Sequence, residues 1–390
     1  MSRRYSPSET MRYDSLWDNG EKLVYESPVE YIAFNGGGVK GIAYAGVIKA
    51  LIELDLVKNV KVWSGTSIGS IAMLLITSGV PLDFIEEYLF CIKTEDVISK
   101  NWFSKMSYPS NLVNLFYSMG LDDGDKVLRL VEKILEKACL PVDITLKEYY
   151  KKTGKYIVPS VSSINTNGGE TLYLSPSLYP DFPVAHAVRI SSCFPIAFSP
   201  QLIKDRSVKD GVRCLLDGGL YENCPIAAFD LFDADDKLAA ANRRAVAFYF
   251  LNYGQQSREY EDVKSFKDYG SSLLNSMHSD IQKHVTTRDY FWQRIIPIEC
   301  KDVRYMSSDM TYSDKEKLAN TGYLSTMKYF KERSKKIKEE GFPDSLFVPS
   351  YKAKCANIEF SDEDVKHIRA YSVNINRTSN CLLKHNFGKL

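Results

Sequence analysis

The sequence predicts an α/β layered fold with a mainly parallel central sheet. From Val29 to Leu251, short apolar runs typical of strands alternate with longer runs of helical periodicity. Two of these strands each lead into a glycine-containing turn that opens a helix. The chain has 390 residues, of which 44% are hydrophobic and 25% charged, so it has a globular composition and enough apolar residues for a large core.

We expect three parts along the chain. Residues 1–28 form a polar and aromatic N-terminal arm that ends at Pro28, and residues 29–340 form the main domain. Beyond Gly341 and Pro343 the pattern weakens, so residues 341–390 are either a small appended element or a tail. The pattern leaves these two alternatives open.

The first third of the domain is predicted to alternate strands and helices. The expected strands are Val29–Phe34 and Val60–Trp63, and the expected helices are Gly41–Leu54, Ile68–Ser78, Pro81–Ile92 and the amphipathic Asp125–Cys139. The aromatic stretch from Trp102 to Met119 has no clean period. A connecting subdomain explains it better than a lipid-facing lid.

The rest of the domain continues the alternation. We expect a hairpin of Tyr156–Ile164 and Thr171–Leu174, strands at Val212–Leu216, Ala245–Leu251 and Ile295–Ile298, a short helix at Pro183–Ser192, helical pattern within Val263–Trp292, and a final long helix at Asp314–Glu340.

The first glycine-containing turn follows the strand Val29–Phe34. It reads Asn35-Gly36-Gly37-Gly38-Val39-Lys40-Gly41, which also fits the G-x-G-x-x-G fingerprint of dinucleotide-binding proteins. That fingerprint requires an acidic residue after the next strand, where this chain has Trp63-Ser64-Gly65-Thr66-Ser67. A P-loop is excluded because Lys40 precedes Gly41. Backbone N–H groups of such a turn can instead face a developing negative charge.

The second turn, Gly65-Thr66-Ser67-Ile68-Gly69, matches G-x-S-x-G between a strand and a helix. Small flanking residues permit a sharp elbow that exposes the Ser67 hydroxyl at a helix N-terminus. The plain alternative is that Ser67 is only a helix N-cap. The nearby glycine turn favours a nucleophile.

A serine nucleophile needs a base. None of the five histidines, at positions 186, 278, 284, 367 and 385, lies in a glycine turn or another signature context. Asp217 is the better candidate, because it ends a strand and precedes Gly218 and Gly219, which allow the backbone to turn sharply. An acidic turn after a strand is common, so this signal is weak alone.

Taken together, the three motifs resemble those of the patatin-like phospholipases. The segments Ala187–Ser192 with Pro195 and Phe198–Pro200, and Leu220–Pro225 after the aspartate, look similar too. The resemblance runs from about Val29 to about Phe330. It implies a three-layer α/β/α patatin-like fold with a Ser-Asp dyad and no catalytic histidine.

Carried over by position, the resemblance makes Ser67 the nucleophile and Asp217 the general base. The amides of Gly37 and Gly38 would form the oxyanion hole, and Lys40 fills the basic position of the glycine motif. From the residues alone, the alternative is that Lys40 is an ordinary solvated first-turn lysine. The remaining motif residues are Gly36, Gly41, Gly65, Gly69, Gly218 and Gly219.

The implied activity is that of a phospholipase A-like acyl hydrolase that needs no metal or organic cofactor. An acyltransferase or thioesterase that uses the same dyad, and a lipid-binding scaffold without catalysis, stay as alternatives. Some members of the family are toxins that a host protein switches on, so an activating protein partner is compatible with the resemblance.

Charge and cysteine content constrain partners and compartment. The formal net charge is +1, which gives no global attraction for nucleic acid. The N-terminus lacks an apolar run long enough for a signal peptide, and the eight cysteines show no Cys-x-x-Cys pair. We expect a cytoplasmic protein in a reducing compartment that associates peripherally with phospholipid membranes, with secretion by a non-classical route left open.

The last long helix offers a candidate membrane contact. Tyr323, Met327, Phe330 and Ile337 repeat at helical spacing, and Lys328, Lys331, Lys335 and Lys338 follow the same spacing on an adjacent face. This pattern fits an interfacial helix on anionic lipid. It fits slightly better a terminal helix that packs its apolar stripe on the core and leaves a solvated basic face.

Overall fold

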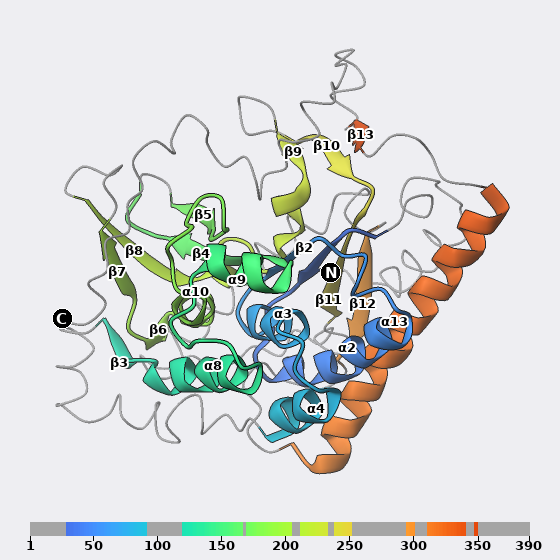
Figure 1. Cartoon of the computed structure of the whole chain (residues 1–390), viewed down its shortest axis with the longest axis horizontal. Coiled ribbons are helices and arrows are strands. Elements are labelled where there is room, and N and C mark those ends of the chain that lie inside the picture. The colour runs from blue at the N-terminus through green and yellow to red at the C-terminus, as the bar shows by residue number, and fades with distance from the viewer. Residues whose placement is uncertain are drawn as a thin grey trace, which may run out of the picture.

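The computed structural model describes residues 29–91, 119–166, 169–204, 211–232, 238–251, 294–300, 310–340 and 347–349. The predicted arm 1–28, the aromatic stretch up to position 118, the pattern at 263–292 and the tail after 350 lie outside these residues. Figure 1 shows the described elements as coloured ribbons around a central sheet.

The central sheet is mixed. Its strand order is β12-β11-β1-β2-β4-β8-β7, and β5 pairs with β4. The strands are β1 (Tyr31–Phe34), β2 (Val62–Gly65), β4 (Tyr156–Ser163), β5 (Glu170–Tyr173), β7 (Gln201–Lys204), β8 (Val212–Asp217), β11 (Ala245–Leu251) and β12 (Ile295–Glu299).

Parallel pairing runs from β12 through β11, β1 and β2 to β4, and antiparallel pairing joins β4 to β5 and β8, and β8 to β7. The predicted hairpin and the predicted α/β class are therefore confirmed. The antiparallel half was not predicted beyond the hairpin.

One face of the sheet carries most of the helices. They are α2 (Ala43–Glu53), α3 (Ile68–Thr77), α4 (Leu82–Cys91), α8 (Asp125–Lys137), α9 (Leu146–Thr153), α10 (Val184–Ser191) and α13 (Tyr312–Glu340). Alternate strand residues such as Ile32, Phe34 and Trp63 point into this layer and are fully buried. Because side chains alternate along a strand, their neighbours Tyr31, Ala33 and Val62 pack on the opposite face.

The opposite face is covered, among the described residues, by the short 3₁₀ helix η3 (Pro225–Phe229), whose Ile226 and Phe229 pack on β1 and β11. Two further 3₁₀ helices are η1 (Gly38–Ile42), which follows β1 after the glycine turn begins, and η2 (Gly218–Leu220), which directly follows β8. Helices on both sides of a mixed sheet give the three-layer α/β/α arrangement that the family resemblance implies.

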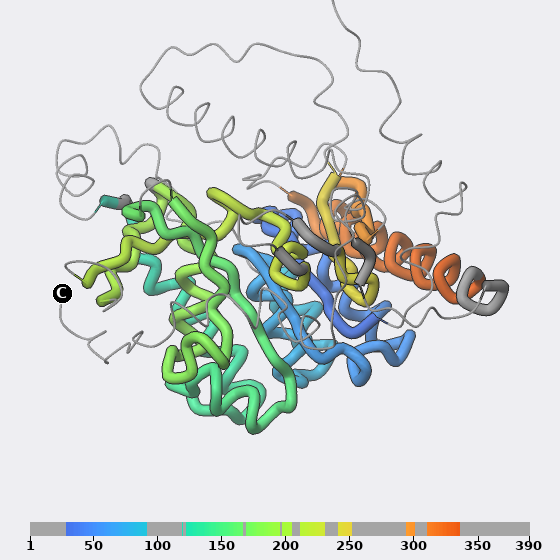
Figure 2. The backbone as a smooth tube through the Cα atoms, turned by 90° about the horizontal axis from the view of Figure 1, so that it is seen from above, coloured from blue at the N-terminus to red at the C-terminus, as the bar shows by residue number. Residues whose placement is uncertain are grey.

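The long helix α13 lies along α2 in both views (Figures 1 and 2). A Cβ added to Gly46 of α2 would lie 1.8 Å from the Ala319 carbonyl oxygen, so the two helices touch backbone to backbone. Phe330 is buried, and the Tyr323 hydroxyl donates to Glu53 of α2 at 2.6 Å. The packing interpretation of the apolar stripe is thus supported at these two residues. The side chains of Ile337 and Lys338 lie outside the description.

Several short elements were not predicted. Besides α9, the strand β7 and the 3₁₀ helices, they are β3 (Gly120–Asp122) with β6 (Ile196–Phe198), and β9 (Leu231–Phe232) with β10 (Leu238–Asn242) and β13 (Phe347–Pro349). The strand β13 pairs with β10, so at least these residues beyond position 340 contact the main domain. Within the described ranges, no helix has the length and apolar character needed to span a bilayer.

Candidate active site

Ser67 sits in a strained turn between β2 and α3. Its backbone has φ 54° and ψ −127°, a region that residues with a side chain seldom adopt and that costs about 1–3 kcal/mol. Although Ser67 occupies the N-cap position of α3, its side chain forms no capping hydrogen bond. The hydroxyl is therefore available for another role, which disfavours the plain N-cap interpretation.

The flanking glycines make this turn possible through close backbone contacts. A Cβ on Gly65 would lie 2.4 Å from the Gly69 carbonyl oxygen, and one on Gly69 would lie 2.3 Å from the Phe34 carbonyl oxygen. Any side chain at either position would push α3 away from β1 or β2. These contacts explain physically why serine stands between two glycines here.

The glycine turn after β1 lies directly beside Ser67. A Cβ on Gly36 would approach the Ser67 Cβ to 3.2 Å and the Asn223 Oδ1 to 2.3 Å. Gly37 is extended, with φ −176°, and Gly38 adopts the left-handed φ of 54°. Gly41 packs on Ile68, the first residue of α3.

The amides of Gly37 and Gly38 precede the first internal donor of η1, which is the Lys40 N–H to the Gly37 oxygen at 3.2 Å. Within the described part of the chain, neither amide donates a backbone hydrogen bond. Because helix-start amides lack intrahelical partners, they are available to an anion next to Ser67.

Lys40 does not extend into solvent. It is only 6% exposed, and burial lowers the pKa of its ammonium group. The interpretation of Lys40 as a solvated first-turn lysine is therefore wrong. Its neighbour Cys300 acts in the opposite direction and favours the charged form of the lysine.

Asp217 ends β8 and lies 2% exposed beside Ser67. Its Oδ1 accepts a hydrogen bond from the Gly219 N–H at 2.8 Å, which closes the tight turn of η2. A Cβ on Gly218 would lie 2.4 Å from the Ser160 carbonyl oxygen, so this turn also needs a glycine.

Burial raises the pKa of the Asp217 carboxyl from 3.8 to about 7, and hydrogen bonding by the Gly219 amide and the Ser67 side chain partly offsets that rise. The Oδ2 atom is buried and makes no hydrogen bond of regular geometry. The Ser67 hydroxyl is thus close enough to affect the carboxyl but is not locked to it, which is common in unliganded catalytic sites.

The C-terminal end of α10 and the residues just after it bind the backbone amides of Ser67 and Asp217. The Ser67 N–H donates to the carbonyl oxygen of Ser191 at 3.0 Å and to its Oγ at 3.1 Å. Two residues later, the Cys193 carbonyl oxygen accepts from the Asp217 N–H at 3.0 Å. One short segment therefore fixes the backbone positions of the serine and the aspartate relative to each other.

A buried hydroxyl network supports the same segment. Ser191 Oγ donates to the Ser160 carbonyl oxygen at 2.7 Å, and Ser160 Oγ lies 2.6 Å from Thr66 Oγ1. Asn223 reaches the glycine turn from the other side, with its Nδ2 donating to the Gly36 oxygen at 3.0 Å. Sequence analysis assigned these residues no role, although Ser191 and Asn223 lie in the segments that resemble the family.

The structure thus brings Ser67, Asp217 and the glycine turn together at one end of β1, β2 and β8. The only histidine among the described residues is His186 on α10, and burial together with Arg189 lowers the pKa of its imidazole. No group of three or more His, Cys, Asp or Glu side chains in the described ranges could hold a metal ion.

Comparison with known proteins gives a family match. The model of the family described as patatin-like phospholipase matches residues 32–230, which contain all three motifs. The "Uncharacterized protein YqhO" of Bacillus subtilis strain 168 is 27% identical over 294 residues, covering 73% of this chain and 92% of that protein.

A second relative is the "Probable lipid hydrolase 463L" of Invertebrate iridescent virus 6, which is 24% identical over 262 residues, covering 65% of this chain and 83% of that protein. Among solved structures, VipD from Legionella pneumophila superposes with a TM-score of 0.48 at 15% identity, covering 79% of this chain and 68% of that one.

Proposed function

We propose, because this chain belongs to the patatin-like phospholipase family, that it is a phospholipase A-like acyl hydrolase. It would cleave fatty-acyl esters of glycerophospholipids through a Ser67–Asp217 dyad and an acyl-enzyme intermediate. One observation carries this proposal. Ser67 has a strained backbone and a hydroxyl that makes no helix-capping hydrogen bond, and it lies beside the buried Asp217 carboxyl, whose pKa is about 7. One relative is named a probable lipid hydrolase, and the activity proposed here belongs to the same class of enzyme.

The dyad accounts for the acid–base chemistry without a histidine. Asp217 takes the proton of the Ser67 hydroxyl as its oxygen attacks the ester carbonyl carbon. A carboxylate with a pKa near 7 is a much better base than one at its usual value, because it is closer to the operating pH. The same proton then passes to the departing alkoxide of the lysophospholipid, leaving the acyl group on Ser67.

The glycine turn would stabilise the charge that develops on the substrate oxygen. The N–H groups of Gly37 and Gly38 are without backbone acceptors in the described structure and lie on the turn that packs against Ser67. Loss of one such donor typically costs about 10²–10³ in kcat. Water activated by Asp217 then hydrolyses the acyl-enzyme and releases the fatty acid.

Two variants test the dyad. Ser67→Ala and Asp217→Asn should each abolish release of fatty acid from phospholipid vesicles while the melting temperature stays close to that of the parent. Because both residues act in one step, the double variant should be no worse than either single variant. Substantial activity in folded Asp217→Asn would overturn the dyad.

Product analysis separates the competing activities. With a phospholipid and a large excess of an alcohol, a hydrolase releases mainly free fatty acid, and an acyltransferase forms mainly the new ester. If wild type and Ser67→Ala bind lipid equally and neither turns it over, the chain is a lipid-binding scaffold and the proposed hydrolysis is wrong.

A further inference from the structure

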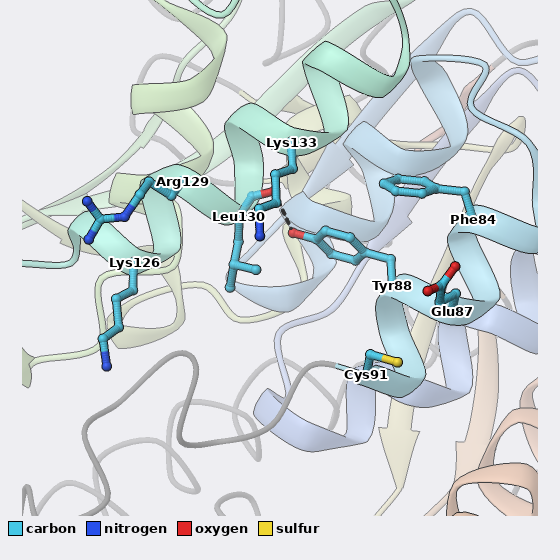
Figure 3. Close-up of a pocket in the computed structure, with 8 residues that line it drawn as sticks. All are labelled: Phe84, Glu87, Tyr88, Cys91, Lys126, Arg129, Leu130 and Lys133. Carbon is cyan, nitrogen blue, oxygen red and sulfur yellow. Dashed lines mark hydrogen bonds between the residues drawn. The ribbon is translucent and has the colours of Figure 1, made fainter.

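A pocket lies between α4 and α8, and neither Ser67 nor Asp217 lines it. It has a volume of about 510 Å³. Figure 3 shows its lining, which α4 and α8 supply in equal shares: Phe84, Glu87, Tyr88, Cys91, Lys126, Arg129, Leu130 and Lys133. We call it the α4–α8 pocket.

The wall formed by α4 contains two aromatic rings, Phe84 and Tyr88. The Tyr88 ring is buried, and its hydroxyl donates to the Leu130 carbonyl oxygen of α8 at 2.8 Å. The Phe84 ring lies 5.7 Å from the Tyr88 ring, centroid to centroid, and stays partly exposed. The hydrogen bond from Tyr88 connects α4 to α8 and holds the apolar floor of the pocket between them.

The wall formed by α8 is cationic. Lys126, Arg129 and Lys133 follow one another at spacings of three and four residues, which places them on one helix face. The opposite face of α8 is buried through residues such as Val131 and Ile134, so the three cations are held toward the pocket side. Glu87 is the only carboxylate in the lining.

Two of the cations form no ion pair in the described part of the chain. Arg129 and Lys133 are exposed, and no acidic side chain in the described ranges forms an ion pair with either of them. Even without Lys126, Arg129 and Lys133 outnumber Glu87, the one carboxylate of the lining, in a chain whose net charge is only +1. A concave surface with this charge attracts an anion.

We propose that the α4–α8 pocket binds an anionic phospholipid of a membrane surface. Arg129 and Lys133 would bind the phosphate and other anionic groups of the head, since guanidinium groups match phosphate oxygens in pairs. The first part of an acyl chain would lie on Phe84, Tyr88 and Leu130. A small soluble phosphate ligand would use the cations but would leave this apolar floor uncovered.

Binding at this pocket does not depend on the proposed hydrolysis. The lining residues are separate from the dyad, so a bound lipid would hold the protein on a surface and would not be cleaved there. The full chain carrying Ser67→Ala is therefore the right background for binding measurements, because it leaves the vesicles intact whether or not the parent is a hydrolase.

The test compares binding to phosphatidylcholine vesicles with and without phosphatidylserine by co-sedimentation. Arg129→Glu with Lys133→Glu should weaken binding to the phosphatidylserine vesicles by more than about tenfold at moderate salt, and by less at high salt, where charges are screened. The matched control is Lys147→Glu with Lys151→Glu on α9, which makes the same change in net charge at two exposed lysines outside the pocket.

Three outcomes would overturn the proposal. The pocket variant could bind phosphatidylserine vesicles as well as the control variant does. The protein with the unmodified pocket could also bind neutral and anionic vesicles equally well. Alternatively, inorganic phosphate could raise the melting temperature of the protein with the unmodified pocket but not that of the pocket variant, while both proteins bind vesicles equally well. That last result would assign the site to a soluble phosphate ligand.

Discussion

At the residue scale, the distinctive feature is that the end of α10 and the residues just after it bind the backbone amides of both proposed catalytic residues. Ser191 accepts from the Ser67 amide, and Cys193 accepts from the Asp217 amide. A strained residue such as Ser67 persists only where its surroundings hold it in place. The Ser191 hydroxyl is therefore a positioning group, since it binds the Ser67 amide and the Ser160 carbonyl at once.

Ser191→Ala should lower kcat by about tenfold to a hundredfold with KM nearly unchanged, because small displacements of a nucleophile are costly to the chemical step. The matched control is Ser192→Ala, whose lost hydrogen bond goes only to the Val188 carbonyl oxygen inside α10. Steady-state kinetics on a soluble ester measure both parameters. Equal kinetics in the two variants would show that Ser191 only fills space.

At the element scale, helix α13 is attached to the core through backbone contact with α2. The sequence pattern allowed α13 either a membrane-facing or a packing role. The position of Gly46 against Ala319, and of Gly322 against Ala43, requires that no side chain intervene between the helices. The exposed lysines Lys328, Lys331 and Lys335 face away from this contact.

Gly46→Ala should destabilise the fold. Replacing a helical glycine by alanine gains up to about 1 kcal/mol in propensity. A methyl group 1.8 Å from a backbone oxygen forces the helices apart, however, and overpacking of this kind costs about 1–3 kcal/mol or more. The cost of the clash should exceed the gain in helix propensity, so the urea concentration at the midpoint of unfolding should fall.

The control for this prediction is Lys49→Ala in the same helix, at a partly exposed position, which should change stability by less than about 0.5 kcal/mol. If Gly46→Ala proved as stable as Lys49→Ala, α13 would not be packed on α2 as described. The membrane-facing role of its apolar stripe would then regain support.

At the scale of the whole molecule, sequence patterns identified the elements whose signal is local. The strands β1, β8 and β11 and the helices α3 and α8 follow from apolar periodicity and from glycine at their ends, so they lie within a few residues of the prediction. The strands β7, β9, β10 and β13 are short, and β13 pairs with β10, which lies far away in the sequence, so no local pattern revealed them.

The same distinction applies to the candidate site. Ser67, Asp217 and the glycine turn lie in motifs and could be chosen from the sequence. Other features arise only when separate segments meet. They are the burial of Lys40, the hydrogen bond from the Ser67 amide to Ser191 of α10, and the contact of Asn223 with Gly36. The raised pKa of Asp217 belongs to this second group, since burial by the whole fold causes it.

The most direct test of the proposed dyad is the pH dependence of kcat/KM for a soluble ester, which reports ionisations of the free enzyme. Asp217 can accept a proton only when ionised, and its pKa is about 7, so kcat/KM should fall as pH drops through about 7 and level off above it. His186→Gln serves as the control, because an imidazole also titrates in this region. We predict the same profile in wild type and His186→Gln. A profile that stays flat down to pH values near the usual carboxyl pKa, or a step that disappears in His186→Gln, would contradict Asp217 as the base.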